Sequence, residues 1–330
     1  MDAKRANNLT LATIFVIVTA IMAISLPDRF MTLINWRSMA LQFPEYGLLA
    51  FGIMLAMLTG GIDLSLVSIV SLSGVLSGMF LSRHAELGLP PGITILIAIV
   101  IALVTAALCG LLNGVLIAFA NVPAIIATLG TNGLFLGIAI VLTRGHGIQG
   151  FPSQFIMIAN GMTLGIPNNF IIFVVIALLI GLLLSRSRLG FQMRLLGASP
   201  EAAQYSGINN RSVLIKTHIL AALLAGVAAI IIISKVNSIR PGYGSGYLLL
   251  SVLIAILGGT NPAGGFATTL GVTLGIFTMQ VLTSGLNIIG FLPFFRRFIY
   301  GVFLLAVMVI HHYRKQSGEF RLPIPKMKKS

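Results

Sequence analysis

The stretch ASPEAAQYSG, residues 198–207, is a polar island between two long apolar segments and has the features of a complete short helix. Ser199 is suited to cap this helix, because its hydroxyl can accept from a free backbone N–H one turn on. Pro200 suits the first helical position, and Glu201 favours the positive end of the helix dipole. Gly207 favours the left-handed turn that ends a helix. Two interpretations follow: a stable surface turn, or a rigid helix that another protein grips.

The composition around this stretch indicates a multi-pass membrane protein. Of the 330 residues, 57% are hydrophobic and only 8% are charged, whereas soluble domains carry about 25% charged residues. The net charge of +14 does not indicate nucleic-acid binding, because the basic residues are not gathered beside aromatic residues on one face. Cys109 is the only cysteine, which excludes an intrachain disulfide and a cysteine metal site and favours a small apolar packing role.

A window of about 20 apolar residues predicts an all-α fold with about ten transmembrane helices. The first run follows Lys4 and Arg5 and is interpreted as a retained span rather than a signal peptide. The eighth is short and bounded by glycines, so we expect a discontinuous or tilted helix. The predicted spans are 9–26, 38–58, 64–82, 92–119, 123–142, 168–185, 213–234, 247–259, 266–286 and 294–312.

The basic residues predict the orientation of these spans. If both termini are cytoplasmic, all but eight of the 21 Lys and Arg residues lie on the inner side, as the positive-inside rule requires. The short helix at 199–207 is then cytoplasmic. We expect a single transmembrane domain over 1–312 and a basic cytoplasmic tail over 313–330. The longest outer loop, about 143–167, is rich in glycine and predicts a short re-entrant or surface structure.

A weak internal repeat relates two parts of the chain, about 45–145 and 245–312. The stretch LAMLTGGID at 55–63 resembles IAILGGTN at 254–261, and each ends one predicted span. Duplicated halves are common in transporters, with the solute path at their interface. Glycine pairs in membrane helices also recur by chance, so both explanations stay open.

Polar residues near or inside the spans are the candidates for a translocation path or gate. Asp63 is the only acidic residue between the second and third spans. It can cap the third span or contact a solute, and both roles are compatible if the cap fixes a gate. Hydroxyls and amides in spans can bond across helices or line a wet path. The candidates are Gly60, Gly61, Asp63, Ser65, Asn113, Thr128, Thr131, Gly258, Gly259 and Asn261.

Several chemistries find no motif in this chain. There is no His-Glu-x-x-His motif, no acidic cluster for a metal and no Gly-x-Ser-x-Gly turn, so we predict no metal, no cofactor and no enzyme activity. A P-loop is also absent. Ionisable residues inside the spans are scarce, whereas ion-coupled carriers commonly use them. The energy for transport is therefore expected to come from a separate subunit.

Five motifs in order over residues 45–312 then resemble one family. They are GGIDLS at 60–65, NVPAIIATLGT at 121–131, PEAAQYSGI at 200–208, GGTNPAGG at 258–265 and LTSGLN at 282–287. With them the chain resembles the permease subunits of bacterial ABC importers for ribose and related sugars, a group with autoinducer-2 and nucleoside relatives. One such motif would be weak, whereas five in order are specific.

The resemblance implies a permease in the bacterial cytoplasmic (inner) membrane. Its expected partners are an ATP-binding subunit dimer, a second permease subunit of the same or a related chain, an extracytoplasmic solute-binding protein and membrane lipid. A coupling helix would transmit the motion of the ATPases to the path. This role falls on Glu201, Ala202, Ala203, Ser206 and Gly207, with Ser199 and Pro200 completing the helix.

Two departures from the family pattern leave the solute and the second permease subunit open. Leu66-Val67-Ser68 stands where the family usually has Val-Gly-Ser, and residues 244–248 lack the usual acidic residues. The alternative function is an ion-coupled secondary transporter of a small polar solute. A membrane-embedded enzyme is a third interpretation, but it lacks a catalytic constellation.

Overall fold

The structure is a computed structural model that describes residues 2–316. Every predicted span contains one helix, and within the described residues eight helices are long and apolar enough to cross a membrane. The polytopic all-α fold is therefore confirmed. The ten helices are α1 (Asp2–Ser25), α3 (Leu33–Leu58), α4 (Leu66–Leu81), α6 (Pro91–Phe119), α7 (Ala124–Thr143), α9 (Asn168–Arg186), α12 (Asn210–Val236), α13 (Tyr247–Leu257), α14 (Thr269–Ile289) and α15 (Pro293–Gln316).

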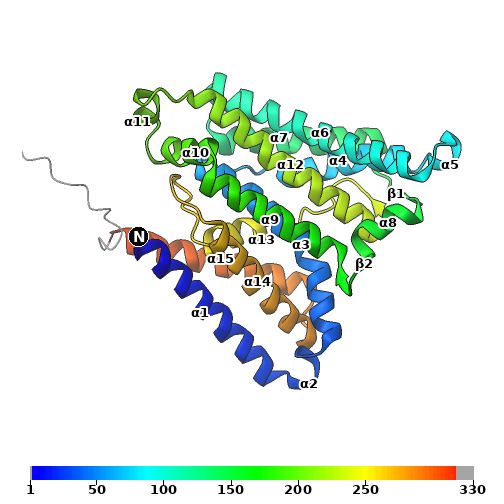
Figure 1. The fold of residues 1–330 in the computed structure, drawn as a ribbon, viewed down its shortest axis with the longest axis horizontal. Helices are drawn as coiled ribbons and strands as arrows, with labels where there is room; N and C mark the ends of the chain where they lie inside the picture. The colour runs from blue at the N-terminus through cyan, green and yellow to red at the C-terminus, as the bar shows by residue number, and fades with distance from the viewer. Residues whose placement is uncertain (1, 317–330) are drawn as a thin grey trace, which may run out of the picture.

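Short elements join these helices at the two ends of the molecule (Figure 1). One end carries α10 and α11 and the beginning of α1, and we call it the α11 end. The opposite end carries α5, α8 and strands β1 and β2, and we call it the strand end. The short elements are α2 (Pro27–Phe30), α5 (His84–Leu87), β1 (Ile148–Gln149), α8 (Ser153–Asn160), β2 (Met162–Thr163), β3 (Ile166–Pro167), α10 (Arg188–Ala198), α11 (Pro200–Tyr205) and β4 (Ser238–Ile239).

The outer loop predicted at 143–167 forms a small surface structure at the strand end. Strand β1 pairs antiparallel with β4, which follows α12, and β2 pairs with β3 in a short hairpin. The predicted basic tail begins inside a helix, because α15 continues to Gln316. Residues 317–330 of that tail lie outside the described residues.

Helix α3 is the centre of the bundle. Every residue from Phe43 to Leu58 is buried, and a membrane helix that is buried on all faces must be enclosed by other helices. Helices α9, α12, α13 and α14 pack against it. Helix α12 packs closely on α6 through glycines, because a Cβ at Gly110 would lie 2.5 Å from the carbonyl oxygen of His218. Small residues of this kind let membrane helices approach each other.

Two helices are shorter than a full span because the chain next to them is not helical. Helix α4 begins at Leu66, after the irregular residues 59–65, and α13 has 11 residues after the irregular residues 240–246. Eleven residues of helix extend about 17 Å, against a hydrocarbon core of about 30 Å. The predicted discontinuous eighth helix is therefore confirmed.

The two segments of the proposed repeat end their helices in the same way. Gly60 donates to the Met57 carbonyl (2.9 Å) and Gly61 to that of Ala56 (3.2 Å). At the end of α13, Gly259 donates to Ile256 (2.9 Å) and Thr260 to Ala255 (3.0 Å). Both pairs form the left-handed helix ending that needs a positive φ, which is +91° at Gly60 and +80° at Gly259.

Candidate functional site

Helix α11 has the capped form that the sequence predicts. The Ser199 hydroxyl accepts from the Ala202 N–H at 3.2 Å, and Pro200 occupies the first helical position. At the other end Gly207 has φ +74°, and its N–H donates to the Gln204 carbonyl at 3.0 Å. Both ends are thus satisfied by local bonds, which makes α11 a stiff unit.

One face of α11 is held by the bundle and the other is open. Ala203 is fully buried, whereas Tyr205 is 93% exposed and Glu201 is also exposed. Asn210, at the start of α12, donates its side-chain amide to the Pro200 carbonyl at 2.9 Å. A movement of α11 is therefore linked directly to α12.

Helix α10 connects α11 to the centre of the bundle by backbone contact. A Cβ at Gly197 would lie 1.9 Å from the Leu58 carbonyl oxygen and 2.5 Å from the Gly265 nitrogen. The Gly265 N–H in turn donates to the Leu58 carbonyl at 3.0 Å. The end of α3, the loop after α13 and the helix before α11 thus meet at one point without intervening side chains.

A cleft of about 820 Å³ separates α11 from the interior. Pro200 and Gln204 line it on the α11 side, and His218 of α12 lies on its inner wall. The remaining wall comes from the ends of other membrane helices. These lining residues include Thr59, Gly60, Gly61, Asn121, Val122, Pro123 and Ala124.

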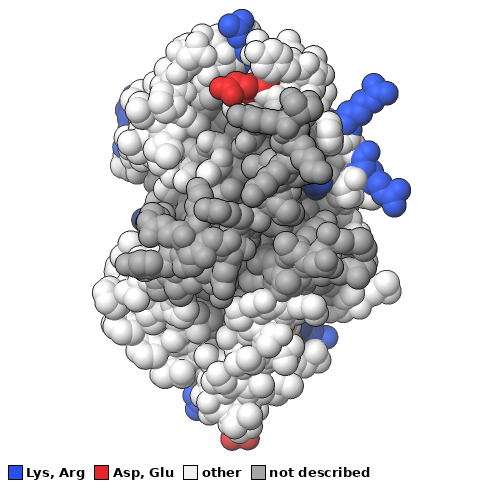
Figure 2. All heavy atoms as spheres, turned by 90° about the vertical axis from the view of Figure 1, so that its left-hand side faces the viewer, with Lys and Arg blue, Asp and Glu red and all other residues white. Residues whose placement is uncertain are grey.

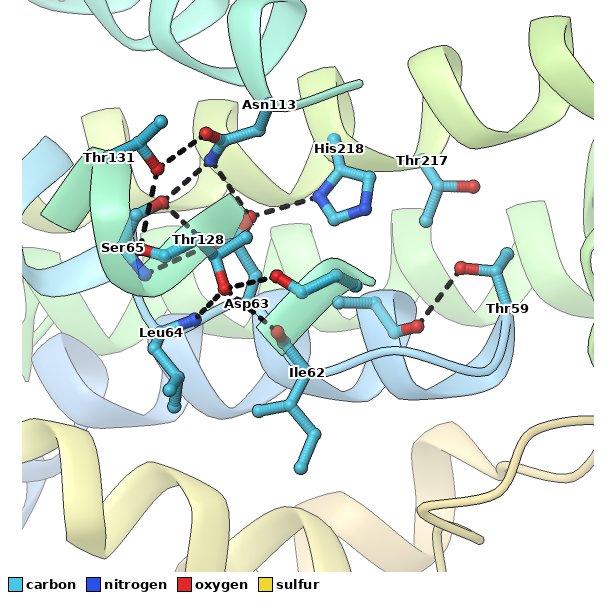
Figure 3. Close-up of polar contacts among 12 residues, drawn as sticks. Thr59, Ile62, Asp63, Leu64, Ser65, Asn113, Thr128, Thr131, Thr217 and His218 are labelled. Carbon is cyan, nitrogen blue, oxygen red and sulfur yellow. Dashed lines mark hydrogen bonds and ion pairs between the residues drawn. The ribbon is translucent and has the colours of Figure 1, made fainter. Parts of the chain in front are cut away.

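A buried polar network lies behind this cleft (Figure 3). Asp63 and Ser65 come from the irregular segment before α4, Asn113 from α6, Thr128 and Thr131 from α7, and His218 from α12. All six side chains are at most 4% exposed. We call these six residues the polar network.

Hydrogen bonds connect the members of the polar network in a chain. The Thr131 hydroxyl donates to Asn113 Oδ1 at 2.7 Å, and Asn113 Nδ2 donates to Ser65 Oγ at 2.7 Å. The Ser65 hydroxyl donates to Asp63 Oδ1 at 2.6 Å. Each polar side chain is thereby satisfied without water, which removes the cost of burying it between membrane helices.

Thr128 and Asp63 also hold the irregular backbone of residues 62–65. Thr128 Oγ1 accepts from the Leu64 N–H at 3.1 Å and lies 3.1 Å from the Ile62 carbonyl oxygen. Asp63 accepts from the Ser65 N–H at 2.9 Å within the turn that precedes α4. The predicted helix cap is not formed, because the N-cap residue of α4 is Ser65 and it has no side-chain cap hydrogen bond. Irregular backbone at this depth is tolerated only when its polar groups are paired in this way.

The histidine partner of Asp63 was not predicted from the sequence. His218 Nδ1 lies 3.0 Å from Asp63 Oδ2, and both side chains are almost fully buried. Burial raises the pKa of the Asp63 carboxyl, but the hydrogen bonds from His218 and Ser65 and the charge of His218 outweigh it, so that the pKa lies below its ordinary value. The signal in the sequence was a histidine inside an apolar span, where ionisable residues are rare.

The structure brings together only part of the predicted path or gate. Gly60 and Gly61 line the cleft, and five further candidates belong to the polar network. Gly258 instead packs against α14, where a Cβ would lie 2.6 Å from the Val272 Cα. Asn261 closes its own turn, donating to the Gly264 carbonyl at 2.9 Å. No group of three or more potential metal ligands occurs among residues 2–316 that are described.

The fold and this site define a class: a multi-pass helical membrane protein with a paired polar interior behind an exposed, rigid surface helix. A family profile described as "Branched-chain amino acid transport system / permease component" matches residues 35–308. The chain belongs to this family, and it is a permease component of an ABC importer, in which ATP hydrolysis resides on a separate subunit. This membership favours the importer over the ion-coupled carrier.

Curated relatives resemble the chain over most of its length. The ribose import permease protein RbsC of Bacillus subtilis (strain 168) is 33% identical over 308 residues, 92% of this chain and 91% of the relative. The D-allose transport system permease protein AlsC of Escherichia coli (strain K12) is 29% identical over 297 residues, 90% and 89% of the two chains. The autoinducer 2 import system permease protein LsrD of Yersinia enterocolitica is 31% identical over 269 residues, 80% and 79%. No solved structure matches the chain.

Proposed function

We propose that this permease moves a sugar or sugar-like polar solute into the bacterial cytoplasm, and that α11 is the helix through which an ATPase drives it. The observation that carries the proposal is the position of α11. It is capped at both ends, exposes Tyr205 and Glu201, and lies across a cleft from the polar network. Large aromatic side chains are enriched at protein interfaces, and a capped helix transmits force better than a loop.

A polar solute fits both the relatives and the interior. The printed names of three relatives give ribose, D-allose and autoinducer 2 as their solutes. The polar network supplies amide and hydroxyl groups to the interior of the bundle, and such groups can exchange hydrogen bonds with the hydroxyls of a sugar. Gly60, Gly61 and the polar network are then parts of a gate at the inner end of the path.

The α11 end is proposed to face the cytoplasm. Figure 2 views this end and shows basic side chains projecting from it. Arg186, Arg188, Arg194 and Arg211 belong to α9, α10 and α12 at their α11 ends, and cytoplasmic segments of membrane proteins carry such an excess. Both termini are then proposed to lie in the cytoplasm, because α1 begins at this end (Figure 1) and the number of predicted spans is even.

The assembly is proposed to contain two permease subunits, the same or related, two ATP-binding subunits at α11 and a solute-binding protein at the strand end. Lipid covers the apolar outer faces, where side chains such as Val141 and Leu178 are exposed in the isolated chain. The matching ends of α3 and α13 support a duplicated transmembrane domain.

Charge reversal on α11 tests the coupling role. In the purified importer, Glu201→Arg is expected to uncouple ATP hydrolysis from uptake, because the exposed carboxylate of α11 becomes a cation. Asp28→Arg is the matched control, since Asp28 is an exposed carboxylate at the far end of α1, on α2. The control should retain the ATPase and its coupling. Normal coupled uptake by Glu201→Arg and by Gly207→Pro would refute the assignment.

A further inference from the structure

A second buried polar cluster lies outside the polar network and contains a carboxylate inside a membrane helix. Glu45 of α3 is 2% exposed. Lys235, near the end of α12, places its Nζ 2.7 Å from Glu45 Oε1. Tyr247, the first residue of α13, donates its hydroxyl to Glu45 Oε2 at 2.6 Å. Three helices that are distant in the chain thus meet at one carboxylate.

A neutral pair adjoins this carboxylate. The Tyr46 hydroxyl donates to Gln280 Oε1 of α14, and the rings of Tyr46 and Tyr247 lie with their centroids 5.9 Å apart. Gln280 is 1% exposed, and its amide nitrogen Nε2 is buried without a hydrogen-bond partner. A buried donor without a partner costs about 1–3 kcal/mol, which is a reason to expect that it has a partner in another state of the protein.

The cluster lies inside the bundle, along the middle turns of α3 and α14 and at the strand-end termini of α12 and α13. Glu45 is twelve residues into the 26-residue α3, and Gln280 is eleven residues into the 21-residue α14. Helix α13 begins at Tyr247, where the chain changes from irregular to helical. Ionisable residues at such a depth are costly and mark solute pathways. Solute sites of transporters are commonly built near the midplane by interrupted helices.

We propose that Glu45, Tyr46, Tyr247 and Gln280 form the site in the translocation path where a neutral polyhydroxylated solute is held. This inference rests on the proposed function and adds the residues and the chemical class of the solute. One hydroxyl of such a solute can donate to Glu45 in place of Lys235, while Tyr247 keeps its hydrogen bond to Glu45 and its hydroxyl oxygen accepts from a second solute hydroxyl. Gln280 Nε2 then donates to a third hydroxyl, and the tyrosine rings pack on the C–H face of the solute.

Lys235 closes this site in the present structure. Its side chain is 25% exposed while Glu45 is buried, so the ammonium group separates the carboxylate from the surface. As the solute enters, one of its hydroxyls replaces the Lys235 ammonium as a donor to Glu45, so the carboxylate keeps a hydrogen-bond donor throughout.

The test measures uptake by the complete importer, the permease with its ATPase and binding protein, using labelled D-ribose, D-allose, their deoxy analogues and L-leucine. Glu45→Gln and Tyr247→Phe are compared with wild type, and Thr13→Val is the control because Thr13 is an exposed polar residue in the middle of α1, outside both buried polar clusters. The wild type is expected to transport a sugar. Both variants should slow it roughly tenfold or more, the loss expected for a hydrogen bond to a charged group. They should also discriminate less between the sugar and its deoxy analogue.

The outcomes separate this inference from the proposed function. Unchanged sugar uptake and unchanged discrimination in both variants would refute the site and leave the importer intact. Uptake of leucine without any sugar would refute the polyhydroxylated class. ATP-dependent uptake of no solute by the wild type would refute both. Tyr247→Phe decides if Glu45→Gln does not fold, because it removes a single hydroxyl and keeps the ring.

Discussion

Replacing His218 with glutamine should destabilise the protein, because it removes the imidazole that lies 3.0 Å from the Asp63 carboxyl. The substitution removes the charged partner of Asp63, whose side chain is fully buried. Breaking a buried ion pair on one side costs about 3–5 kcal/mol. Asp63 keeps its hydrogen bonds from the Ser65 N–H (2.9 Å) and hydroxyl (2.6 Å), so we expect the lower value, about 3 kcal/mol.

The single cysteine supplies the assay. Cys109 is 6% exposed in α6, four residues before Asn113, and a thiol-reactive fluorophore can label it only when the bundle opens. At about 2–4 °C per kcal/mol, the ratio for domains of 150–250 residues, a loss of about 3 kcal/mol should lower the midpoint of labelling on heating by roughly 6–12 °C. The double variant Asp63→Asn, His218→Gln should lose less than the sum of the two single variants, since it leaves no buried charge.

Lowering the pH tests the contact between Asp63 and His218 in an independent way. The pKa of Asp63 in the folded protein lies below its ordinary value. The ionised carboxyl therefore adds to the free energy of unfolding above an ordinary carboxyl pKa of about 3.9, and this stabilisation is lost as the pH falls toward the folded-state pKa. A thiol reacts too slowly in acid to report here, so the thermal midpoint is followed by circular dichroism, and its decline below about pH 4 should be smaller in His218→Gln than in wild type. An unchanged midpoint in His218→Gln, or strictly additive losses in the double variant, would show that the two residues are not coupled.

Two further predictions concern the connection between α11 and the bundle. Gly197→Ala should destabilise the protein by about 1–3 kcal/mol, because the added Cβ would lie 1.9 Å from the Leu58 carbonyl oxygen. The midpoint of Cys109 labelling measures this loss. Gly130→Ala is the control, because Gly130 has open space around it. Ser199→Ala should remove the cap of α11 at a cost of about 1 kcal/mol and lower the ratio of solute transported to ATP hydrolysed, while the labelling midpoint changes little. Equal ratios in Ser199→Ala and wild type would mean that the cap is not needed for coupling.

The features that follow from local sequence were predicted correctly. The helices follow from runs of apolar residues, and eight of those described are long and apolar enough to cross a membrane. The caps of α11 follow from Ser199, Pro200 and Gly207. The discontinuous eighth helix follows from its length and its bounding glycines. These features depend on residues within a few positions of each other, because helix caps and membrane spans are set by backbone hydrogen bonds and by apolar composition along one continuous segment.

The charged partners were decided only by the tertiary structure. Asp63 meets His218, 155 residues away, and Glu45 meets Lys235, 190 residues away. A soluble helix shows its inner face through an apolar stripe, but a membrane span is apolar toward both lipid and protein. The pattern of α3 and α12 therefore does not reveal which way Glu45 or His218 points. Packing against the other helices determines that direction, and with it the two buried polar sites to which we assign function.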